Sequence, residues 1–293
     1  MAFTNTDKLT ETIDYTGETP AQMQKKNDSQ PLKKALGAET PVKTERKFKE
    51  IKLPDFKEFL KAGVQFGHQT NKWNPKMGVY IHTSKNGIHV IDLNKTLELL
   101  SKALSAVQMS ASKGPILFVG TKSQAHDILR SEAIRCGAFF VDSRWAGGLL
   151  TNYKTIKQSL DKLNDLEVQF EEGVENRTKQ EISWMKKDWE RLNRLYGGVK
   201  GMRELPSMVF VVDVNFEKGA VEEAKSLGIP IVAICDTNVD PEGITFKIPS
   251  NDDAVGAIKL ITGLVADAVL DGNQGSGVKH IFKDYLKMEI EKK

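Results

Sequence analysis

The sequence predicts an α/β protein in which helices cover both faces of a parallel sheet and an antiparallel helical hairpin is inserted between two halves. Several short runs, such as 116–119 and 208–212, are almost entirely apolar, as strands buried on both faces are. Segments of helix length separate these runs, and strands that alternate with helices indicate a parallel sheet. In the middle of the chain, apolar residues recur at spacings of three and four, which is typical of paired helices.

The first ordered elements are predicted from Pro54 onward. An amphipathic helix ends at Gly63 and is followed by a loop that contains glycine and asparagine. Two β-prone runs, 79–82 and 88–91, then flank an Asn-Gly pair. This pair between such runs is a strong signal for a β-hairpin.

The remaining strands and helices follow from hydrophobic periodicity. They are a helix over 94–112, a strand over 116–119, a helix from 123, a strand around 139–141, a strand over 208–212, a helix over 217–227, a strand over 231–234, a short strand over 246–248 and a helix over 252–270. The alternation is thus present on both sides of the central segment.

Two apolar stripes mark that central segment. They consist of Tyr153, Ile156, Leu160, Leu163, Leu166 and Phe170, and of Ile182, Met185, Trp189, Leu192, Leu195 and Val199. A polar stretch near 173–179 joins them, so we expect two antiparallel helices that pack along their apolar seams as in a coiled coil. Two ordinary helices packed on the sheet are the alternative.

These elements divide the chain into four parts. Residues 1–52 are polar with few apolar side chains, which predicts a disordered N-terminal extension. The α/β domain comprises 53–152 and 204–272, and 153–203 form the inserted hairpin. Residues 273–293 are predicted to be a basic C-terminal tail.

Composition narrows the class of function. The formal net charge is only +3 over 293 residues, so any affinity for nucleic acid must come from local patches. Cys136 and Cys235 lie far apart in apolar contexts, which indicates neither a disulfide framework nor a zinc site and fits a reducing cytoplasm. No apolar run reaches the ~20 residues that span a bilayer, so we expect no membrane partner.

The sequence predicts no catalytic residue, metal site or cofactor. Neither cysteine lies in a context that would activate a thiolate. His126 and His280 have no evident metal partner at i+3 or i+4.

The most informative segment runs from Phe59 to Ile91 and contains no aspartate or glutamate, although it carries four lysines and three histidines. A surface without carboxylates suits a polyphosphate, because lysines that neutralise phosphates release counterions. Trp73 offers a flat face to an unstacked base, and its polar neighbours can bind sugars or base edges. The alternative is a solvated loop anchored by Trp73.

A second segment without carboxylates, 143–154, follows a predicted parallel strand and therefore lies at the binding edge of the sheet. Gly147 and Gly148 allow close approach and positive φ, and Arg144 can bind phosphate. Thr151 or Asn152 can cap the next helix. A structural turn in which Trp145 fills the core is equally compatible.

The Gly120-Thr121-Lys122 turn resembles an anion site at a helix N-terminus. It lacks the spacing of a phosphate-binding Walker motif, although Lys122 could contact a phosphate. An α/β enzyme or nucleotide-binding domain is therefore the second hypothesis. Asp236 and Asp240 follow another predicted strand, and we interpret them as turn residues.

An ordered series of motifs resembles one known family. The matching blocks are KAGVQFGHQT (61–70), WNPKM (73–77), ILFVGTK (116–122), RWAGGLLTN (144–152), GGVK (197–200), LP (205–206), GIP (228–230), DTNVDP (236–241) and IP (248–249). Their order and spacing are similar to the S-two family of bacterial small-subunit ribosomal proteins. The N-terminal extension is longer than is typical of that family.

The resemblance implies a flavodoxin-like, three-layer αβα sheet with an inserted helical hairpin. It also implies a non-enzymatic part of the cytoplasmic ribosome that binds small-subunit ribosomal RNA where head meets body, and supports assembly and translation. The implied partners are that RNA and neighbouring small-subunit proteins, including the S-one protein, and not DNA. Carried over by position, the RNA-binding candidates are Gly67, His68, Gln69, Thr70, Lys72, Trp73, Asn74, Lys76, Lys122, Arg144, Trp145, Thr151 and Asn152.

Overall fold

The computed structural model describes residues 51–173 and 177–273. Apart from their innermost residues, the predicted N-terminal extension and C-terminal tail lie outside these ranges. Within the described ranges, no helix combines the length and the apolar character that crossing a membrane requires.

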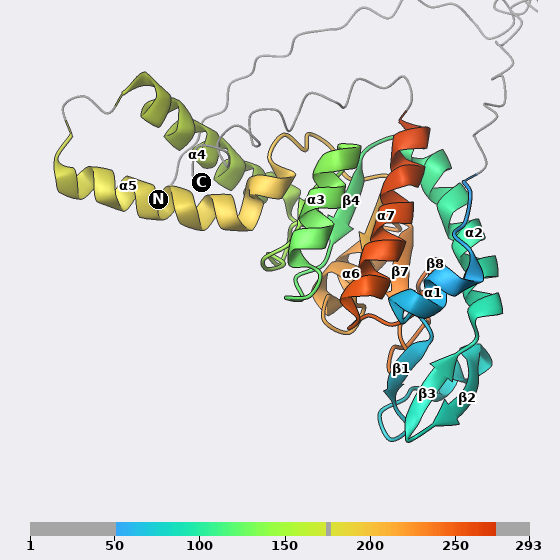
Figure 1. The fold of residues 1–293 in the computed structure, drawn as a ribbon. Helices are drawn as coiled ribbons and strands as arrows, with labels where there is room; N and C mark the ends of the chain where they lie inside the picture. The colour runs from blue at the N-terminus through green and yellow to red at the C-terminus, as the bar shows by residue number, and fades with distance from the viewer. Residues whose placement is uncertain (1–50, 174–176, 274–293) are drawn as a thin grey trace, which may run out of the picture. The chain divides into compact units, whose positions relative to one another are not determined.

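A five-stranded parallel sheet with the order β5-β4-β6-β7-β8 forms the centre of the fold (Figure 1). Its strands are β4 (Ile116–Val119), β5 (Phe139–Val141), β6 (Met208–Val211), β7 (Ile231–Cys235) and β8 (Phe246–Pro249). Every residue of β4, β5, β6 and β7 is buried. This accounts for their continuous apolar sequences.

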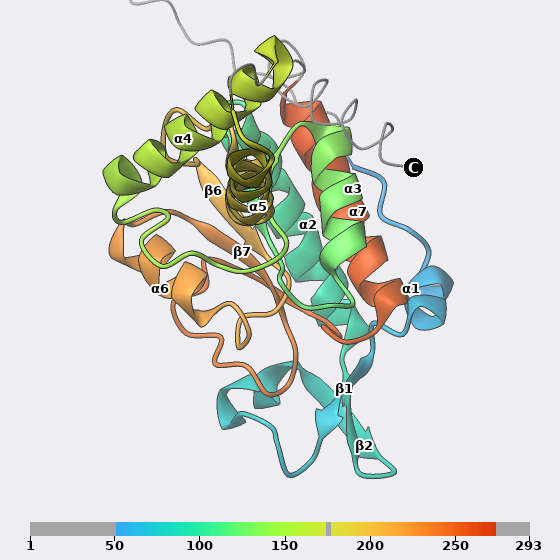
Figure 2. The same ribbon diagram turned by 90° about the vertical axis from the view of Figure 1, so that its left-hand side faces the viewer.

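Helices cover both faces of this sheet, which confirms the predicted three-layer α/β fold. On one side lie α2 (Leu93–Ala111), α3 (His126–Cys136) and α7 (Val255–Gly272), and on the other lies α6 (Lys218–Ser226) (Figure 2). The predicted bounds of these elements agree with the structure to within a few residues.

A second, antiparallel sheet has the order β1-β3-β2 and contains the predicted hairpin. Its strands are β1 (Phe66–Gln69), β2 (Ile81–Lys85) and β3 (Ile88–Ile91). The Asn-Gly turn has positive φ at both residues, 52° and 76°, as a tight hairpin of this type requires. Helix α1 (Phe56–Ala62) precedes strand β1 in the chain and ends at Gly63, as predicted.

The structure differs from the sequence-based prediction on either side of Trp73. The expected loop contains strand β1, and the start of the expected strand over 79–82 belongs to the 3₁₀ helix η1 (Pro75–Tyr80). Pro75 at the first position favours a helical turn, and Asn74 accepts a hydrogen bond from the backbone of Lys76 at 2.9 Å.

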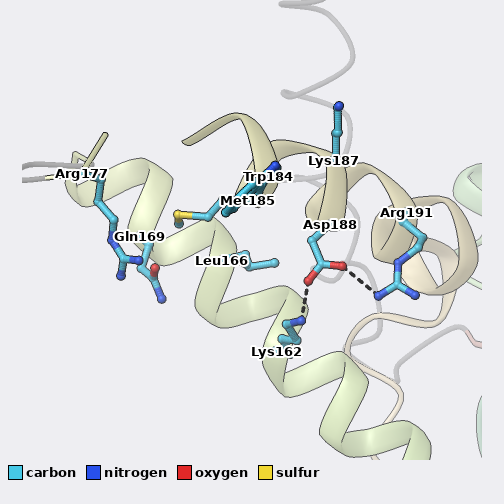
Figure 3. A pocket seen from close by; sticks show the side chains of 9 residues that line it. All are labelled: Lys162, Leu166, Gln169, Arg177, Trp184, Met185, Lys187, Asp188 and Arg191. Atoms are coloured by element: carbon cyan, nitrogen blue, oxygen red, sulfur yellow. Dashed lines mark hydrogen bonds and ion pairs between the residues drawn. The ribbon is translucent and has the colours of Figure 1, made fainter. Parts of the chain in front are cut away.

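The two helices predicted for the central segment are α4 (Tyr153–Glu172) and α5 (Lys179–Tyr196), and they contact each other. Their buried residues belong to the predicted apolar stripes, apart from Tyr196. Lys162 of α4 pairs with Asp188 of α5 (Figure 3). After α5 comes the short helix η2 (Gly197–Val199), which contacts β5.

Candidate functional site

The loops that follow β4, β5, β6 and β7 leave the same edge of the parallel sheet. Parallel strands point their carboxyl ends the same way, so residues far apart in sequence meet there. We call residues 67–76 the first platform and residues 144–152 the second platform. Together with Lys122, they contain every predicted RNA-binding residue.

The loop after β7 attaches the first platform to the parallel sheet. The backbone N–H of His68 donates to Thr237 Oγ1 at 2.9 Å, and the N–H of Asn74 donates to the carbonyl of Thr237 at 2.7 Å. A Cβ at Gly67 would lie 2.6 Å from Thr237 Cγ2. The glycine is therefore required by close packing against this loop.

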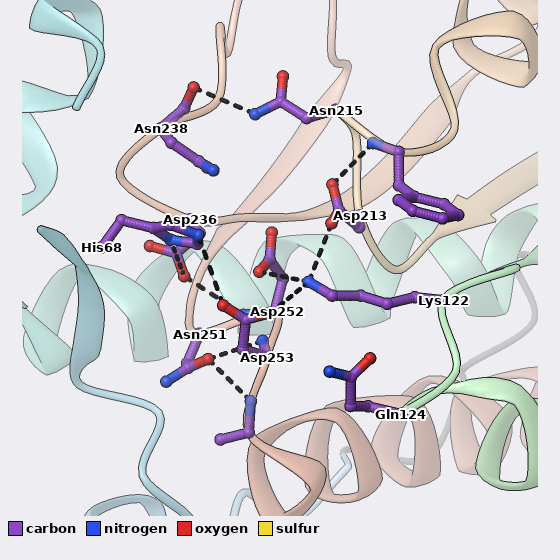
Figure 4. A network of polar contacts seen from close by, with 12 residues as sticks. His68, Lys122, Gln124, Asp213, Asn215, Asp236, Asn238, Asn251, Asp252 and Asp253 are labelled. Atoms are coloured by element: carbon purple, nitrogen blue, oxygen red, sulfur yellow. Dashed lines mark hydrogen bonds and ion pairs between the residues drawn. The ribbon is translucent and has the colours of Figure 1, made fainter. Parts of the chain in front are cut away.

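His68 lies between two carboxylates (Figure 4). Its Nδ1 is 3.0 Å from Asp236 and its Nε2 is 3.4 Å from Asp253. The hydrogen bond that His68 donates to buried Asp236 raises the pKa of His68 above its ordinary value, so the cationic imidazole is favoured.

Lys122 also extends into this acidic cluster. Its amine lies 3.0 Å from Asp213, 3.0 Å from Asp252 and 2.6 Å from Asp253 (Figure 4). Burial lowers the pKa of Lys122, but hydrogen bonds and charges from these carboxylates outweigh it and raise the pKa overall. The charge of Lys122 therefore links the loop after β4 to the loop after β6 and to the segment before α7.

Asp252 is the most perturbed carboxyl group of the cluster. Burial and the nearby charges of Asp213 and Asp236 raise its pKa to about 7, although Lys122 acts against them. Its Oδ2 has no hydrogen-bond partner within the part of the chain that the structure describes. Donor atoms of His68, Asp252 and Asp253 lie within 4.8 Å of one another, and these are ligand types for a divalent cation when the imidazole is neutral and the carboxyl groups are ionised.

The expectation that residues 59–91 create a surface free of acid is wrong in three dimensions. Carboxylates from the loop after β7 and from the N-terminal end of α7 approach His68, and Lys76 pairs with Asp240 at 2.9 Å and with Glu242. The sequence segment lacks acid, but the folded surface around these two cations does not. The turn interpretation is confirmed for Asp240, whose Oδ1 accepts from the Glu242 N–H at 2.9 Å. Asp236 has the further role of partner to His68.

The other residues of the first platform are more available. Gln69, Thr70 and Lys72 are exposed, and the ring of Trp73 is 40% exposed. The ring also packs against His89 at a centroid distance of 5.2 Å and a tilt of 48°. Trp73 is thus a partly covered anchor that still offers surface, and its stacking on an RNA base stays a prediction.

The second platform is organised around one carboxylate, Glu223 of α6. Glu223 accepts hydrogen bonds from Trp145 Nε1 at 2.9 Å and from the N–H groups of Gly148 at 2.7 Å, Leu150 at 3.0 Å and Thr151 at 3.1 Å. The Thr151 hydroxyl adds a fifth bond at 3.0 Å. Burial raises the pKa of Glu223, but these donors outweigh it and the pKa is lowered overall.

This arrangement leaves Arg144, Thr151 and Asn152 exposed. Of the two glycines for which positive φ was expected, Gly148 has it, at 84°, and Gly147 does not. The predicted side-chain cap of α4 is wrong, because Asn152 occupies the N-cap position without capping a backbone N–H. Its Oδ1 accepts instead from the Thr155 hydroxyl at 2.9 Å, while Thr151 is held by Glu223.

The turn after β4 does not form an anion site. Glu217 already accepts the hydrogen bond of the Thr121 N–H, where a phosphate would bind. A Cβ at Gly120 would lie 2.8 Å from Leu129 Cδ1, so core packing accounts for this glycine. The geometry does not support the nucleotide-binding hypothesis.

Sequence reasoning missed the acidic partners of the platforms and of the turn that carries Thr121 and Lys122, namely Asp213, Glu217, Glu223, Asp252 and Asp253. All lie outside the acid-free segments. A weak signal existed for Asp213, Asp252 and Asp253, which follow predicted strands at the edge where ligands bind. No local pattern distinguishes Glu223 from the neighbouring Glu222 on the same helix.

Comparisons with known proteins agree with this architecture. Residues 59–272 match the family model described as Ribosomal protein S2. The chain is 52% identical over 225 residues to a protein of Geotalea uraniireducens (strain Rf4) named "Small ribosomal subunit protein uS2". This match covers 76% of the chain and 88% of the relative. The chain therefore belongs to the ribosomal protein S2 family, whose members are structural proteins of the small ribosomal subunit and not enzymes.

Proposed function

We propose that the chain binds small-subunit ribosomal RNA through the two platforms, and thereby supports subunit assembly and translation. The observation that carries the proposal is that Lys72 of the first platform and Arg144 of the second platform are both exposed. Within residues 51–173 and 177–273, neither side chain has a carboxylate at ion-pair distance. Both charges are thus available to phosphates, and Arg144 adds a planar fork that suits them.

The thirteen candidate residues have different expected roles within this proposal. Gln69, Thr70, Thr151 and Asn152 are exposed hydrogen-bonding groups, suited to sugars and base edges. Gly67, Asn74 and Trp145 shape the platforms through the packing and hydrogen bonds described above. His68, Lys76 and Lys122 already neutralise carboxylates, so we expect their contribution to RNA affinity to be smaller.

The test is filter binding of small-subunit ribosomal RNA to the full chain at several salt concentrations. Substituting Lys72, Lys76 and Arg144 together with alanine should weaken binding about 10- to 1,000-fold and lower the salt slope by up to about three. A control variant with alanine at Lys57, Lys113 and Lys259, which are exposed elsewhere, removes the same charge and should change binding little. If both variants lost the same affinity, binding would depend only on the total charge of the protein, and the proposal that the two platforms bind RNA would be contradicted.

We further propose a position at the junction of head and body, in the cytoplasmic ribosome, and a role in holding the S-one protein. Family membership supports both. Footprinting of the RNA in reconstituted small subunits tests the position. Sedimentation tests the second role, because subunits that lack this chain should retain less S-one protein than complete subunits do.

A further inference from the structure

A groove of about 550 Å³ lies between the inserted helices α4 and α5 (Figure 3). Apolar side chains, among them Leu166, Trp184 and Met185, form part of its lining. The groove lies outside both platforms, and the proposed function above does not use it.

The lining of the groove is basic, although the two helices are balanced in charge. Together α4 and α5 carry eight lysines and arginines and eight aspartates and glutamates. Four cations line the groove with a single carboxylate, Asp188. This segregation of charge gives the groove a positive field that matches an anionic partner.

Asp188 holds two of these cations in place. It pairs with Lys162 across the helices and with Arg191 at 2.8 Å one turn further along α5 (Figure 3). The hydrogen bonds from both lower the pKa of Asp188, so it stays ionised. Arg177 and Lys187 line the groove outside this network, and the charge of Arg177 also acts on Glu181 at the start of α5.

Trp184 differs from the other tryptophan of the same helix. Trp189 is 9% exposed, and its Nε1 donates to Glu167 at 3.3 Å, so it belongs to the helix interface. Trp184 is 61% exposed and is absent from the apolar stripe that pairs the helices. An exposed indole beside arginine and lysine is the arrangement that stacks an unpaired base while cations bind its phosphates.

We propose that this groove binds an unpaired nucleotide of RNA, with the base stacked on Trp184 and the phosphates facing Arg177 and Lys187. The inference deepens the proposed function, because it adds a contact to RNA that is separate from the two platforms. The partner is single-stranded, since a base in a duplex has no free face to stack on an indole.

The experiment is binding of full-length chain to an oligouridylate that carries 4-thiouridine, followed by photo-crosslinking and peptide mapping. Trp184→Ala should weaken binding about ten-fold and remove the crosslink to α5, whereas Trp184→Phe should retain most of both. Lys187→Gln should weaken binding a few-fold. Its matched control is Lys186→Gln, which removes an equal charge from the same helix outside the groove and should have little effect.

Phe216→Ala is the control for loss of an exposed aromatic ring, because Phe216 is 61% exposed and does not line the groove. If Trp184→Ala binds the oligomer as wild type does, the groove proposal is overturned. The proposed function would still stand if the alanine triple at Lys72, Lys76 and Arg144 loses small-subunit RNA. Displacement of the oligomer by polyglutamate, with binding of that peptide lost in Trp184→Ala, would indicate an acidic protein segment and likewise overturn the proposal.

Discussion

The two platforms have the same kind of sequence and opposite electrostatic organisation. Both lie in segments without aspartate or glutamate. In the first platform, carboxylates from distant loops pair with cationic side chains such as His68 and Lys76. In the second, a distant carboxylate binds mainly backbone N–H groups and leaves Arg144 unpaired by any described carboxylate. A segment without acid is thus no guarantee of free positive charge.

The largest effect is expected at Glu223, which organises the second platform. Glu223→Ala removes the acceptor of five hydrogen bonds, and should lower the free energy of unfolding by about 2 kcal/mol. Because the loop that presents Arg144 loses its support, affinity for small-subunit RNA should fall about ten-fold or more. Chemical denaturation and filter binding measure the two effects.

The neighbouring Glu222→Ala is the matched control, since Glu222 is exposed on the same helix. If both variants bind RNA equally well, the second platform does not depend on the carboxylate and the contrast between the platforms is lost.

Gly67→Ala tests the packing of the first platform. The new Cβ would lie 2.6 Å from Thr237 Cγ2, so the platform must shift away from the loop after β7. We expect a loss of about 1–3 kcal/mol in unfolding free energy. Gly147→Ala is the control within the second platform, because no described atom lies within 4 Å of its added Cβ. A thermal melt in which the two variants behave alike would show that Gly67 is not required by packing.

Two carboxyl groups, Glu223 beside the second platform and Asp252 in the acidic cluster next to the first, should contribute to stability with opposite dependence on pH. The pKa of Glu223 is lowered by folding, so its contribution to stability is present above its unfolded pKa and is lost as pH falls through the folded value. The pKa of Asp252 is raised to about 7, so folding favours its protonated form. Stability from this group therefore decreases as pH rises from the ordinary range of a carboxyl group toward 7.

The difference in unfolding free energy between a variant and the wild type, measured at several pH values, isolates the contribution of each carboxyl group. In buffer with a chelator, the unfolding free energy of Asp252→Asn should increase relative to that of the wild type as pH rises from 5 to 8. Glu223→Gln should lose less stability than wild type as pH falls from 6 to 3. Denaturant midpoints give both differences, and a flat difference in either series would contradict the corresponding assignment.

The smallest effects are expected for alanine substitutions of two lysines in the first platform, Lys72 and Lys76. Lys72→Ala should weaken RNA binding a few-fold and lower the salt slope by about one. Lys76→Ala should have less effect, because Lys76 is already paired with Asp240 and Glu242. Equal losses in affinity would mean that RNA displaces these carboxylates from Lys76.

Much of the fold was predictable because burial imposes local patterns. Strands β4 and β6 have continuous apolar sequences since helices cover both sheet faces, and the Asn-Gly pair adopts the positive φ angles of a tight turn. Strand β1 was missed, because Phe66–Gln69 alternates poorly and pairs only through an irregular register with β3. Segments with few buried residues, such as β1, were thus predicted less well than segments with continuous apolar sequences.

The sequence by itself determined which segments form strands and helices and which of them lack acid, since these properties depend on neighbours along the chain. Only the tertiary structure decided which carboxylate meets which cation or N–H group. His68 and Thr237 are 169 positions apart, and Trp145 and Glu223 are 78 apart. The physical reason is that a parallel sheet brings the ends of distant strands to one edge, where burial makes each charge depend on its spatial neighbours.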